Sequence, residues 1–479
     1  MLLWLMFASI LALMTWGADM TSSSGFFLVM FLAGALALLL RHVSRREHVP
    51  SFTTLVVFIA AYCPNALKSI EQGFAFPLPA SGEAVSIALI AFVSFLGISI
   101  GTAQISARIL ERPAKGVEYI VTAGRPEFGA VGIGVAAAIS TMSGFGAGMW
   151  SHYAETVEIQ SGGIRLELLY FPLLFGFSAA MGRATLKEVI GEKLQTSRAA
   201  VMISLWIGTV LLLFIAQSRR MMLGALILAI ASAWLDSTRV SILRTGLVAA
   251  ALSFLGGVLL IGSYLWRQEG PTSNAVEHMR VISGRSVDIA AASQSFTERL
   301  TYLWIDSTSI DHFDALEGRF DLWDAFSTTV IKATPGIIMP DKYLTGKIVC
   351  EDAYESLGMF IDLPCTPVTE GLLFGGIGGL AFTAASFGVT LGIVTALYRR
   401  GTFACITLAG VAMSTLVLIE CSAFPIVDSA RLFLLTMSLA TVFAWTARLL
   451  YRMRSTNTTV RQTRRAPRAV YQRPATLEK

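Results

Sequence analysis

The chain has 479 residues, of which 54% are hydrophobic and only 14% are charged, and its mean hydropathy is +0.65. Soluble domains carry about 25% charged residues, so this composition excludes a chain made only of soluble domains. Repeated apolar runs of about 17 to 25 residues can each cross a bilayer of about 30 Å. The sequence therefore predicts an all-α polytopic membrane protein with one elaborated loop.

The formal charge of +5 is divided unevenly along the chain. The polar segment 267–369 holds 15 acidic and 8 basic residues, so its own charge is negative. The basic excess lies in short loops and in the C-terminal segment 451–479, which is typical of membrane topology rather than of nucleic-acid binding. We therefore expect contact with anionic membrane lipid and no nucleic-acid partner.

Apolar segments in chain order predict about 12 transmembrane helices. They cover residues 1–17, 25–40, 51–66, 85–105, 127–150, 166–182, 199–217, 221–236, 245–266, 370–398, 402–420 and 428–450. The first lacks the positively charged start and the cleavage site of a signal peptide, so we expect it to be retained. The predicted parts are transmembrane helices 1–9 in residues 1–266, a large loop in 267–369, transmembrane helices 10–12 in 370–450 and a basic tail in 451–479.

Lysines and arginines determine the expected orientation. Most of the 37 basic residues lie in the tail and in the loops 41–48, 106–126, 183–198, 236–244 and 399–401. Positively charged loops stay cytoplasmic, so we expect both termini in the cytoplasm and the large loop in the periplasm, with the protein in a bacterial inner membrane. The spans are nearly free of ionisable residues and show no inverted repeat, which favours an enzyme over a transporter.

The large loop contains two predicted helical stretches. Apolar residues recur every three or four positions from Ile310 to Ile331, which predicts an amphipathic helix, and 275–305 has a weaker helical pattern. The segment 334–336 (Thr-Pro-Gly) ends the amphipathic helix. Such a helix can lie on the membrane surface as a lid, with its aromatic face on lipid or on the spans. Trp323 is placed for packing on this face, and stacking on a sugar is the alternative.

Two of the five cysteines, Cys350 and Cys365, lie in the large loop, on the oxidising side of the membrane. A disulfide between them would close about 15 residues and stabilise the protein by about 3 kcal/mol, and two free thiols are the alternative. No Cys/His spacing indicates zinc, and we expect no metal and no cofactor. The acidic residues of the loop indicate a solvated helix face rather than a metal site. They are Asp306, Asp311, Asp314, Asp321 and Asp324.

Two arginine motifs can bind anionic oxygen atoms. Ser218-Arg219-Arg220 lies on the outer side between two spans, and Gly318-Arg319 lies in the large loop. The planar guanidinium group suits the oxygen atoms of a diphosphate. For Arg219 and Arg220 the alternative is contact with lipid headgroups.

Glu370 and His312 are the candidate bases. Glu370 lies where the chain re-enters the membrane. It can cap the helix N-terminus, or it can orient or deprotonate a hydroxyl group, and the sequence favours neither. His278 is a further base candidate in the loop, whereas His152 lies just outside a span.

The span after the large loop carries glycines four positions apart. They are Gly371, Gly375 and Gly379, and then Gly388 and Gly392. Such a stripe lets another backbone approach closely, so we interpret it as a helix-packing surface. The alternative is that the first turns, residues 370–376, border a substrate groove.

The order of these motifs resembles that of Wzy-type O-antigen and exopolysaccharide polymerases and of related ligases. Ser218-Arg219 is similar to the family's Ser-Arg element at a span start, and Gly318-Arg319 to Trp323 is similar to the Gly-Arg…Trp pattern of its large outer loop. The downstream residues are similar to the Pro-x-Lys and Thr-x-x-Glu…Phe-Gly-x-x-Gly run of capsule and exopolysaccharide polymerases. They are Pro340-Asp341-Lys342, Pro367 to Glu370, Phe374-Gly375 and Gly378-Gly379.

The resemblance implies a GT-C-like membrane glycosyltransferase that acts on undecaprenyl-diphosphate-linked oligosaccharide repeat units. It implies that Arg219, Arg220, Arg319 and Lys342 bind the diphosphate and sugar. Glu370 or His312 would then assist the attacking hydroxyl. A chain-length regulator and a flippase are candidate partners. The His-rich pattern of the ligases is not clear in this chain, and ligase activity and polysaccharide transport are the alternatives.

Overall fold

The computed structural model describes residues 81–146, 169–190, 196–215, 302–313, 366–417 and 425–465, and the single positions 50, 54, 62, 323, 327, 330 and 334. These residues form helices, and this part of the chain contains no strand. The all-α class is therefore confirmed for the residues that the structure describes.

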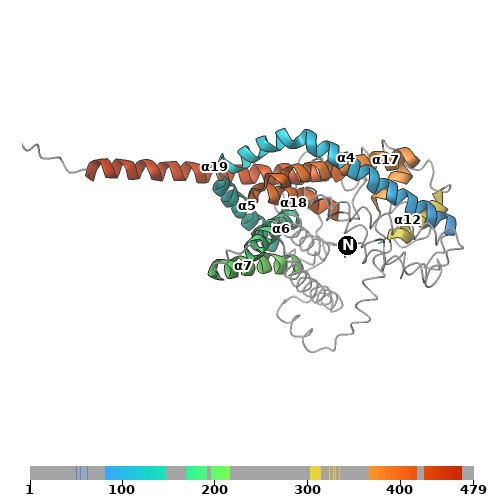
Figure 1. Cartoon of the computed structure of the whole chain (residues 1–479), viewed down its shortest axis with the longest axis horizontal. Coiled ribbons are helices and arrows are strands. Elements are labelled where there is room, and N and C mark those ends of the chain that lie inside the picture. The colour runs from blue at the N-terminus through green and yellow to red at the C-terminus, as the bar shows by residue number, and fades with distance from the viewer. Residues whose placement is uncertain are drawn as a thin grey trace, which may run out of the picture.

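Each predicted span within the described residues corresponds to a helix (Figure 1). The helices are α4 (Gly82–Thr122), α5 (Pro126–Gly146), α6 (Tyr170–Ile190), α7 (Thr196–Ile215), α12 (Tyr302–Asp311), α17 (Pro367–Arg400), α18 (Phe403–Val417) and α19 (Pro425–Arg465). Of the described helices, three are long and apolar enough to cross a membrane, namely α4, α17 and the Ala430–Ser455 part of α19. The chain thus has the helices of a membrane protein. The predicted spans at 1–17, 25–40, 221–236 and 245–266 lie outside the described residues, as does most of 51–66.

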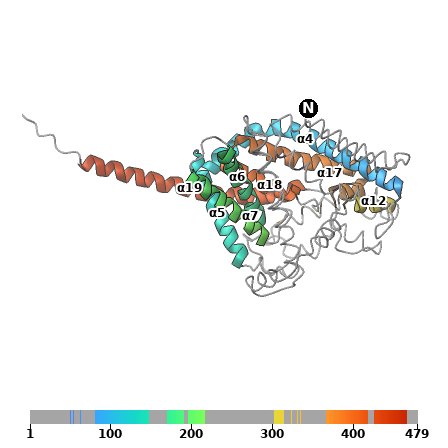
Figure 2. The same cartoon turned by 60° about the horizontal axis from the view of Figure 1, so that its bottom comes forward.

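The parallel helices α4 and α17 form the longest packed pair of the bundle (Figures 1 and 2). A Cβ added at Gly388 would collide with the carbonyl oxygen of Ser99, and one at Gly392 would collide with Ser106. The Ser99 hydroxyl donates a hydrogen bond of 3.0 Å to the Ala384 carbonyl. This half of the glycine stripe is therefore a helix-packing surface, as predicted, because only glycine permits such close approach.

The N-terminal end of α17 is broken rather than straight. Gly376 adopts φ 56° and ψ −135°, a conformation that is strained for any residue with a side chain. Beyond it the chain folds back. Gly379 comes so close to Gly371 that a Cβ at Gly379 would collide with the Gly371 carbonyl oxygen. The first part, 367–374, therefore packs on the part that follows the break. The single uninterrupted span predicted for 370–398 is wrong at this point, because two adjacent glycines permit the chain to reverse.

Small residues also determine the other helix crossings. Gly176 of α6 and Gly410 of α18 face each other so closely that a Cβ on either would meet backbone atoms of the other helix. Gly132 of α5 lies in the same way against Ala440 and Ala444 of α19. Close contact between small residues is typical of helices that pack within a membrane.

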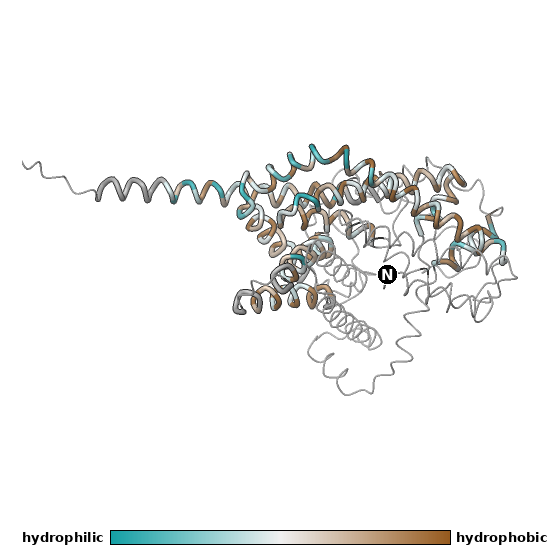
Figure 3. Tube along the Cα trace, in the orientation of Figure 1, coloured by the Kyte–Doolittle hydropathy of each residue, from teal (hydrophilic) through white to brown (hydrophobic). Residues whose placement is uncertain are grey.

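α4 and α19 extend far beyond their predicted membrane boundaries. α4 continues through the stretch predicted as a loop at 106–126, includes Pro113, and ends at Thr122, after which Ala123 adopts the left-handed conformation with φ 48°. α19 continues to Arg465 and projects from the bundle (Figure 1). Figure 3 shows hydrophilic residues along the extension of α4 and at the start of the extension of α19. Hydropathy located the apolar part of each helix but not its end, because Arg, Glu and Lys are good helix formers in water.

Candidate functional site

Helix α12 comes from the large polar loop and lies at the end of the bundle where α4 and α17 begin (Figures 1 and 2). It spans Tyr302–Asp311, so it starts earlier than the helix predicted from Ile310 to Ile331. The described positions 323, 327 and 330 are also helical, in agreement with that prediction. The loop thus places a helix directly on the starts of two apolar helices.

Asp306 is the buried centre of this contact. Its side chain has no exposed surface and accepts hydrogen bonds from three hydroxyl groups. The Tyr62 hydroxyl donates to Oδ2 at 2.6 Å, the Thr366 hydroxyl donates to Oδ1 at 2.5 Å, and the Thr369 hydroxyl donates to the same Oδ1. A buried carboxylate needs such donors because burial removes its hydration. The prediction that Asp306 belongs to a solvated helix face is therefore wrong.

Burial raises the pKa of the Asp306 carboxyl from its ordinary 3.8 to about 6. The hydrogen bonds from Thr366, Thr369 and Tyr62 act in the opposite direction, because they stabilise the ionised form. Near neutral pH the carboxylate form predominates, and it matches the three hydroxyl donors that surround it.

Both aspartates of α12 lie at the N-terminus of another helix. Thr366 is the N-cap of α17, where its side-chain oxygen accepts the Thr369 N–H at 3.0 Å while its hydroxyl donates to Asp306. Asp311 accepts the N–H and the hydroxyl of Ser81, the N-cap of α4, each at 2.5 Å. Helix N-termini carry partial positive charge and therefore favour carboxylates. Two aspartates thus tie α12 to the first turns of two parallel helices.

Tyr62 brings a third segment of the chain into the cluster. Its ring stacks on Phe92 of α4 with a centroid distance of 3.8 Å and lies 6.2 Å from the ring of Tyr302 on α12. All three rings are fully buried. The inner side of the Asp306 cluster is therefore apolar, and the Tyr62 hydroxyl reaches the carboxylate from this side.

Glu370 follows Thr369 in the first turn of α17. The side-chain cap is Thr366, and the Glu370 N–H donates to the Thr366 carbonyl at 2.9 Å. Thr366 therefore provides the side-chain cap, and Glu370 complements the helix dipole through its negative charge. The Glu370 side chain is half-buried at the junction between loop and spans, where it can orient or deprotonate a hydroxyl group.

His312 directly follows α12 and is also half-buried. Its Nδ1 lies 2.9 Å from the carbonyl oxygen of Thr308, which also accepts the His312 main-chain N–H at 3.1 Å. A carbonyl can only accept, so Nδ1 donates this bond, and Nε2 is the ring nitrogen that can serve as a base. The contact with Thr308 thus holds the ring in the tautomer that a general base requires.

The other predicted site residues lie outside the described residues. They are Arg219, Arg220, Arg319 and Lys342, and the two cysteines of the possible disulfide, Cys350 and Cys365. Trp323 is described and is 70% exposed, so it is not buried against the spans, and its packing on lipid stays a prediction. Within the described ranges no three His, Cys, Asp or Glu side chains lie close enough together to hold a metal ion.

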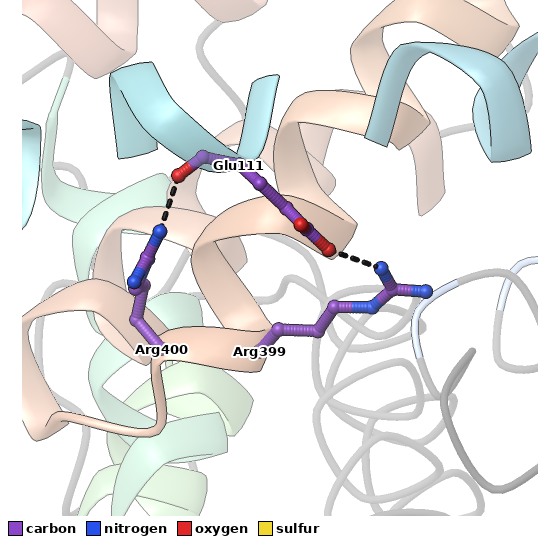
Figure 4. A network of polar contacts seen from close by, with 3 residues as sticks. All are labelled: Glu111, Arg399 and Arg400. Atoms are coloured by element: carbon purple, nitrogen blue, oxygen red, sulfur yellow. Dashed lines mark hydrogen bonds and ion pairs between the residues drawn. The ribbon is translucent and has the colours of Figure 1, made fainter. Parts of the chain in front are cut away.

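Arginines also gather at the opposite end of the bundle, and Figure 4 shows two of them, Arg399 and Arg400, beside Glu111. Arg399 forms an ion pair of 2.9 Å with Glu111, and Arg400 donates to the Glu111 carbonyl oxygen. The buried Arg183 guanidinium lies 4.5 Å from the centroid of the Tyr398 ring and donates to the Tyr398 carbonyl at 3.5 Å. These arginines lie at the C-terminal end of α17, where the helix dipole favours positive charge.

α19 contributes to the same basic end. Arg448 donates to the Ala123 carbonyl at 2.8 Å, and the Trp445 ring N–H donates to the Ile120 carbonyl at 3.1 Å. Residues of the basic segments 106–126, 183–198 and 399–401 therefore lie at one end of the bundle, together with the start of the projecting part of α19. The sequence assigns these segments to a single side of the membrane, and the packing agrees with that grouping.

Local pattern placed Asp306 on a solvated helix face and assigned no role to Tyr62 or Ser81. One signal was present: Asp306 directly follows the apolar run 302–305, where an acidic side chain is out of place. Tyr62 and Ser81 carried no such signal, because their role depends on residues far away in the chain.

No protein-family model, no curated protein and no solved structure matches this chain. A functional assignment therefore depends on the motifs of the sequence and on the geometry where α12 meets α4 and α17.

Proposed function

We propose that the protein is a GT-C-like membrane glycosyltransferase that polymerises undecaprenyl-diphosphate-linked oligosaccharide repeat units into O-antigen, capsule or exopolysaccharide. About 12 transmembrane helices hold it in the bacterial inner membrane, with both termini cytoplasmic and the site on the periplasmic face. The observation that carries the proposal is the order of the sequence motifs, which resembles that of Wzy-type polymerases. In chain order these are Ser218-Arg219, Gly318-Arg319 to Trp323, Pro340 to Lys342, and Thr369-Glu370 through Gly379.

The last of these motifs lies where the polar loop meets the apolar helices. Thr369 donates to Asp306 of the loop helix, and Glu370 follows in the same turn. Phe374 is buried, and the helix breaks directly after it. An enzyme that joins sugars carried on a lipid needs its polar groups at such a boundary, and this position supports the proposal.

The grouping of basic segments supports the proposed orientation. Positively charged loops stay cytoplasmic. The arginine-rich end of the bundle, with Arg183, Arg399 and Arg448, is then cytoplasmic, and α12 with Glu370 faces the periplasm. Lipid-linked repeat units and their elongated products would both be reached from that face.

In the proposed reaction a hydroxyl oxygen of one repeat unit attacks the anomeric carbon of the sugar on a second carrier. A new glycosidic C–O bond forms, the bond between that carbon and the diphosphate oxygen breaks, and undecaprenyl diphosphate leaves with the electron pair. Nε2 of His312 or the Glu370 carboxylate takes the proton of the attacking hydroxyl. Guanidinium and ammonium groups stabilise the charge that develops on the diphosphate. These groups are Arg219, Arg220, Arg319 and Lys342.

Glycan length in cells that lack the protein tests the proposal. Surface and lipid-linked polysaccharide would be separated by size on a gel. Polymerisation predicts that long chains disappear while single repeat units remain, either on their carrier or transferred as one unit. Accumulation of long chains on undecaprenyl diphosphate would instead identify a ligase, and normal glycan would overturn both assignments. A chain-length regulator and a flippase would be sought among proteins that copurify.

The break in α17 favours a second candidate function, transport of the repeat unit. Discontinuous helices are typical of secondary transporters, in which the N-terminus of a half-helix points at an anionic substrate. The segment from Thr366 to Phe374 is a half-helix that ends at the break, and its N-terminus faces the Asp306 carboxylate. Repeat units trapped on the cytoplasmic face of the deletion strain would support transport and count against polymerisation.

Variants of the outer arginines separate the two functions further. Arg219→Ala and Arg319→Ala should abolish long glycan in a polymerase that still inserts normally. Arg→Lys at either position should also impair it, because lysine lacks the planar fork that binds two oxygen atoms at once. Normal glycan length in both alanine variants would count heavily against a role for these residues in catalysis.

A further inference from the structure

The Asp306 carboxylate is fully buried beneath the proposed site, so it does not touch a substrate. We propose that Asp306 is a positioning residue, which fastens α12 to α17 and to Tyr62 and thereby holds His312 and Glu370 at one membrane face. The inference rests on the proposed function only in assigning substrate contacts to His312 and Glu370. The attachment of α12 itself can be measured whatever the function is.

The position of Asp306 relates it to both candidate bases. His312 lies six residues further along, which is about 9 Å of helix rise. Glu370 is the neighbour of Thr369, whose hydroxyl donates to Asp306. Asp306 is therefore connected to His312 along the backbone of α12, and to Glu370 through its hydrogen bond with Thr369.

Three segments of the chain meet at the two oxygen atoms of Asp306. Oδ1 accepts from Thr366 and Thr369 at the start of α17, and Oδ2 accepts from Tyr62. Loss of the carboxylate leaves three hydroxyl groups in an apolar surrounding without their acceptor, and such buried groups are costly. The first turn of α17 and the segment at residue 62 would then both lose their connection to α12.

The groups that face Asp306 from each packed element are hydroxyls rather than cations. Tyr62 faces it from one side and Thr366 and Thr369 from the other, while Tyr302 lies next to Tyr62. No cation belongs to this cluster among the described residues. The attachment therefore depends on hydrogen-bond geometry, which an apolar side chain, or an amide that turns its NH2 donor towards a hydroxyl, does not reproduce.

Two substitutions of Thr369 distinguish hydrogen bonding from packing. Thr369→Val keeps the volume and branching of this fully buried side chain but removes the hydroxyl donor. Thr369→Ser keeps the donor but loses a methyl group. Packing alone predicts that valine is tolerated better, whereas positioning through Asp306 predicts that serine is tolerated better. Thr369 is more suitable than Thr366 for this comparison, because Thr366 also caps the helix.

The test uses the full-length protein in lipid nanodiscs and amide hydrogen exchange of residues 302–313. Asp306→Asn and Thr369→Val should speed the exchange of this segment about ten- to hundredfold, because each removes at least one hydrogen bond of the buried carboxyl group. Thr369→Ser should stay near the wild-type rate. Glu83→Gln is the matched control, since this exposed carboxylate lies in the first turn of α4 at the same end of the bundle.

The same variants are then expressed in the deletion strain, and glycan length is measured. We expect Asp306→Asn and Thr369→Val to shorten the glycan and Thr369→Ser and Glu83→Gln to restore it. Wild-type exchange in Asp306→Asn, or a serine variant as impaired as the valine variant, would overturn the positioning role. Faster exchange in Asp306→Asn with normal glycan would overturn it as well. If the deletion strain itself makes normal glycan, polymerisation fails while the exchange result still decides the attachment of α12.

Discussion

The Thr366 hydroxyl donates a hydrogen bond of 2.5 Å to Asp306, while the same oxygen atom accepts the N–H that caps α17. A single side chain thus begins one helix and binds another. These two functions are normally separate, because an N-cap oxygen needs only to accept. At this position the hydroxyl proton is available for Asp306, so the start of α17 and the attachment of α12 depend on the same residue.

Substitution of Thr366 should therefore destabilise the protein more than substitution of an ordinary N-cap residue does. Thr366→Ala removes a cap worth about 0.5–2 kcal/mol and a hydrogen bond to a charged group worth about 1.5–3 kcal/mol. Thr366→Ser keeps both interactions and should remain close to wild type. Thermal unfolding of the detergent-solubilised protein would measure the difference. An alanine variant that unfolds at the wild-type temperature would contradict the double role of Thr366.

The attachment of α12 should become stronger in mild acid. The native pKa of Asp306 is about 6 and the ordinary value is 3.8, so the folded protein holds this proton more tightly than the unfolded chain does. The resulting stabilisation is fully present below about pH 4 and is lost as the pH rises through about 6. Lowering the pH from 7 to 5 should stabilise the native state by about 1 kcal/mol.

Asp306→Asn should remove this pH dependence, because the amide does not titrate. Amide exchange of residues 302–313 at pH 5 and pH 7, corrected for the intrinsic rates, provides the measurement. If the dependence persists unchanged in Asp306→Asn, another group is responsible.

Ser81 and Asp311 should be coupled energetically. Ser81→Ala removes the N-cap of α4 and one bond to Asp311, which should cost about 0.5–2 kcal/mol. Ser81→Asp is a favourable cap in isolation but places a second carboxylate next to Asp311, so it should be worse than alanine here. A double-mutant cycle with Asp311→Asn in thermal unfolding checks both statements. If Ser81→Asp proves more stable than Ser81→Ala with Asp311 present, the contact does not form in solution.

His312 should be required for its Nε2 rather than for its bond to Thr308. His312→Asn retains a donor near the Nδ1 position but has no group that can act as a base. If His312 is the base, both His312→Asn and His312→Gln should lower the rate of glycan polymerisation by about 10²- to 10⁴-fold. Normal glycan in the asparagine variant would assign His312 a structural role and would leave Glu370 as the base candidate.

The fold of α17 around its break should permit alanine at Gly378 but not at Gly379. A Cβ at Gly379 would collide with the Gly371 carbonyl oxygen, whereas nothing lies within 4 Å of a Cβ at Gly378. Gly379→Ala should therefore reduce folded yield and unfolding temperature strongly, and Gly378→Ala should be close to neutral. Folded yield by size-exclusion chromatography gives the comparison. Equal behaviour of the two variants would mean that α17 does not fold back at Gly376.

Local pattern was sufficient to predict several features of the structure. The spacing of Gly388 and Gly392 identified a packing surface, because residues four apart lie on one face of a helix. Apolar runs identified the helices, and charge grouped the basic segments at one end of the bundle. Local pattern did not predict the end of α4, which continues as a polar helix. It also did not predict the break at Gly376, because glycines at this spacing suit both close packing and a chain reversal.

By itself, the sequence determined that this is an α-helical membrane protein and where its described helices lie, because hydropathy and periodicity are local properties. Residue chemistry alone also named Glu370 and His312 as candidate bases. Only the tertiary structure decided that Asp306 is buried and that Thr366, rather than Glu370, caps α17. The partners of Asp306 lie 60 positions away at Thr366 and 244 positions away at Tyr62. Whether a carboxylate is solvated or enclosed by hydroxyl donors depends on such distant contacts, and no local pattern contains them.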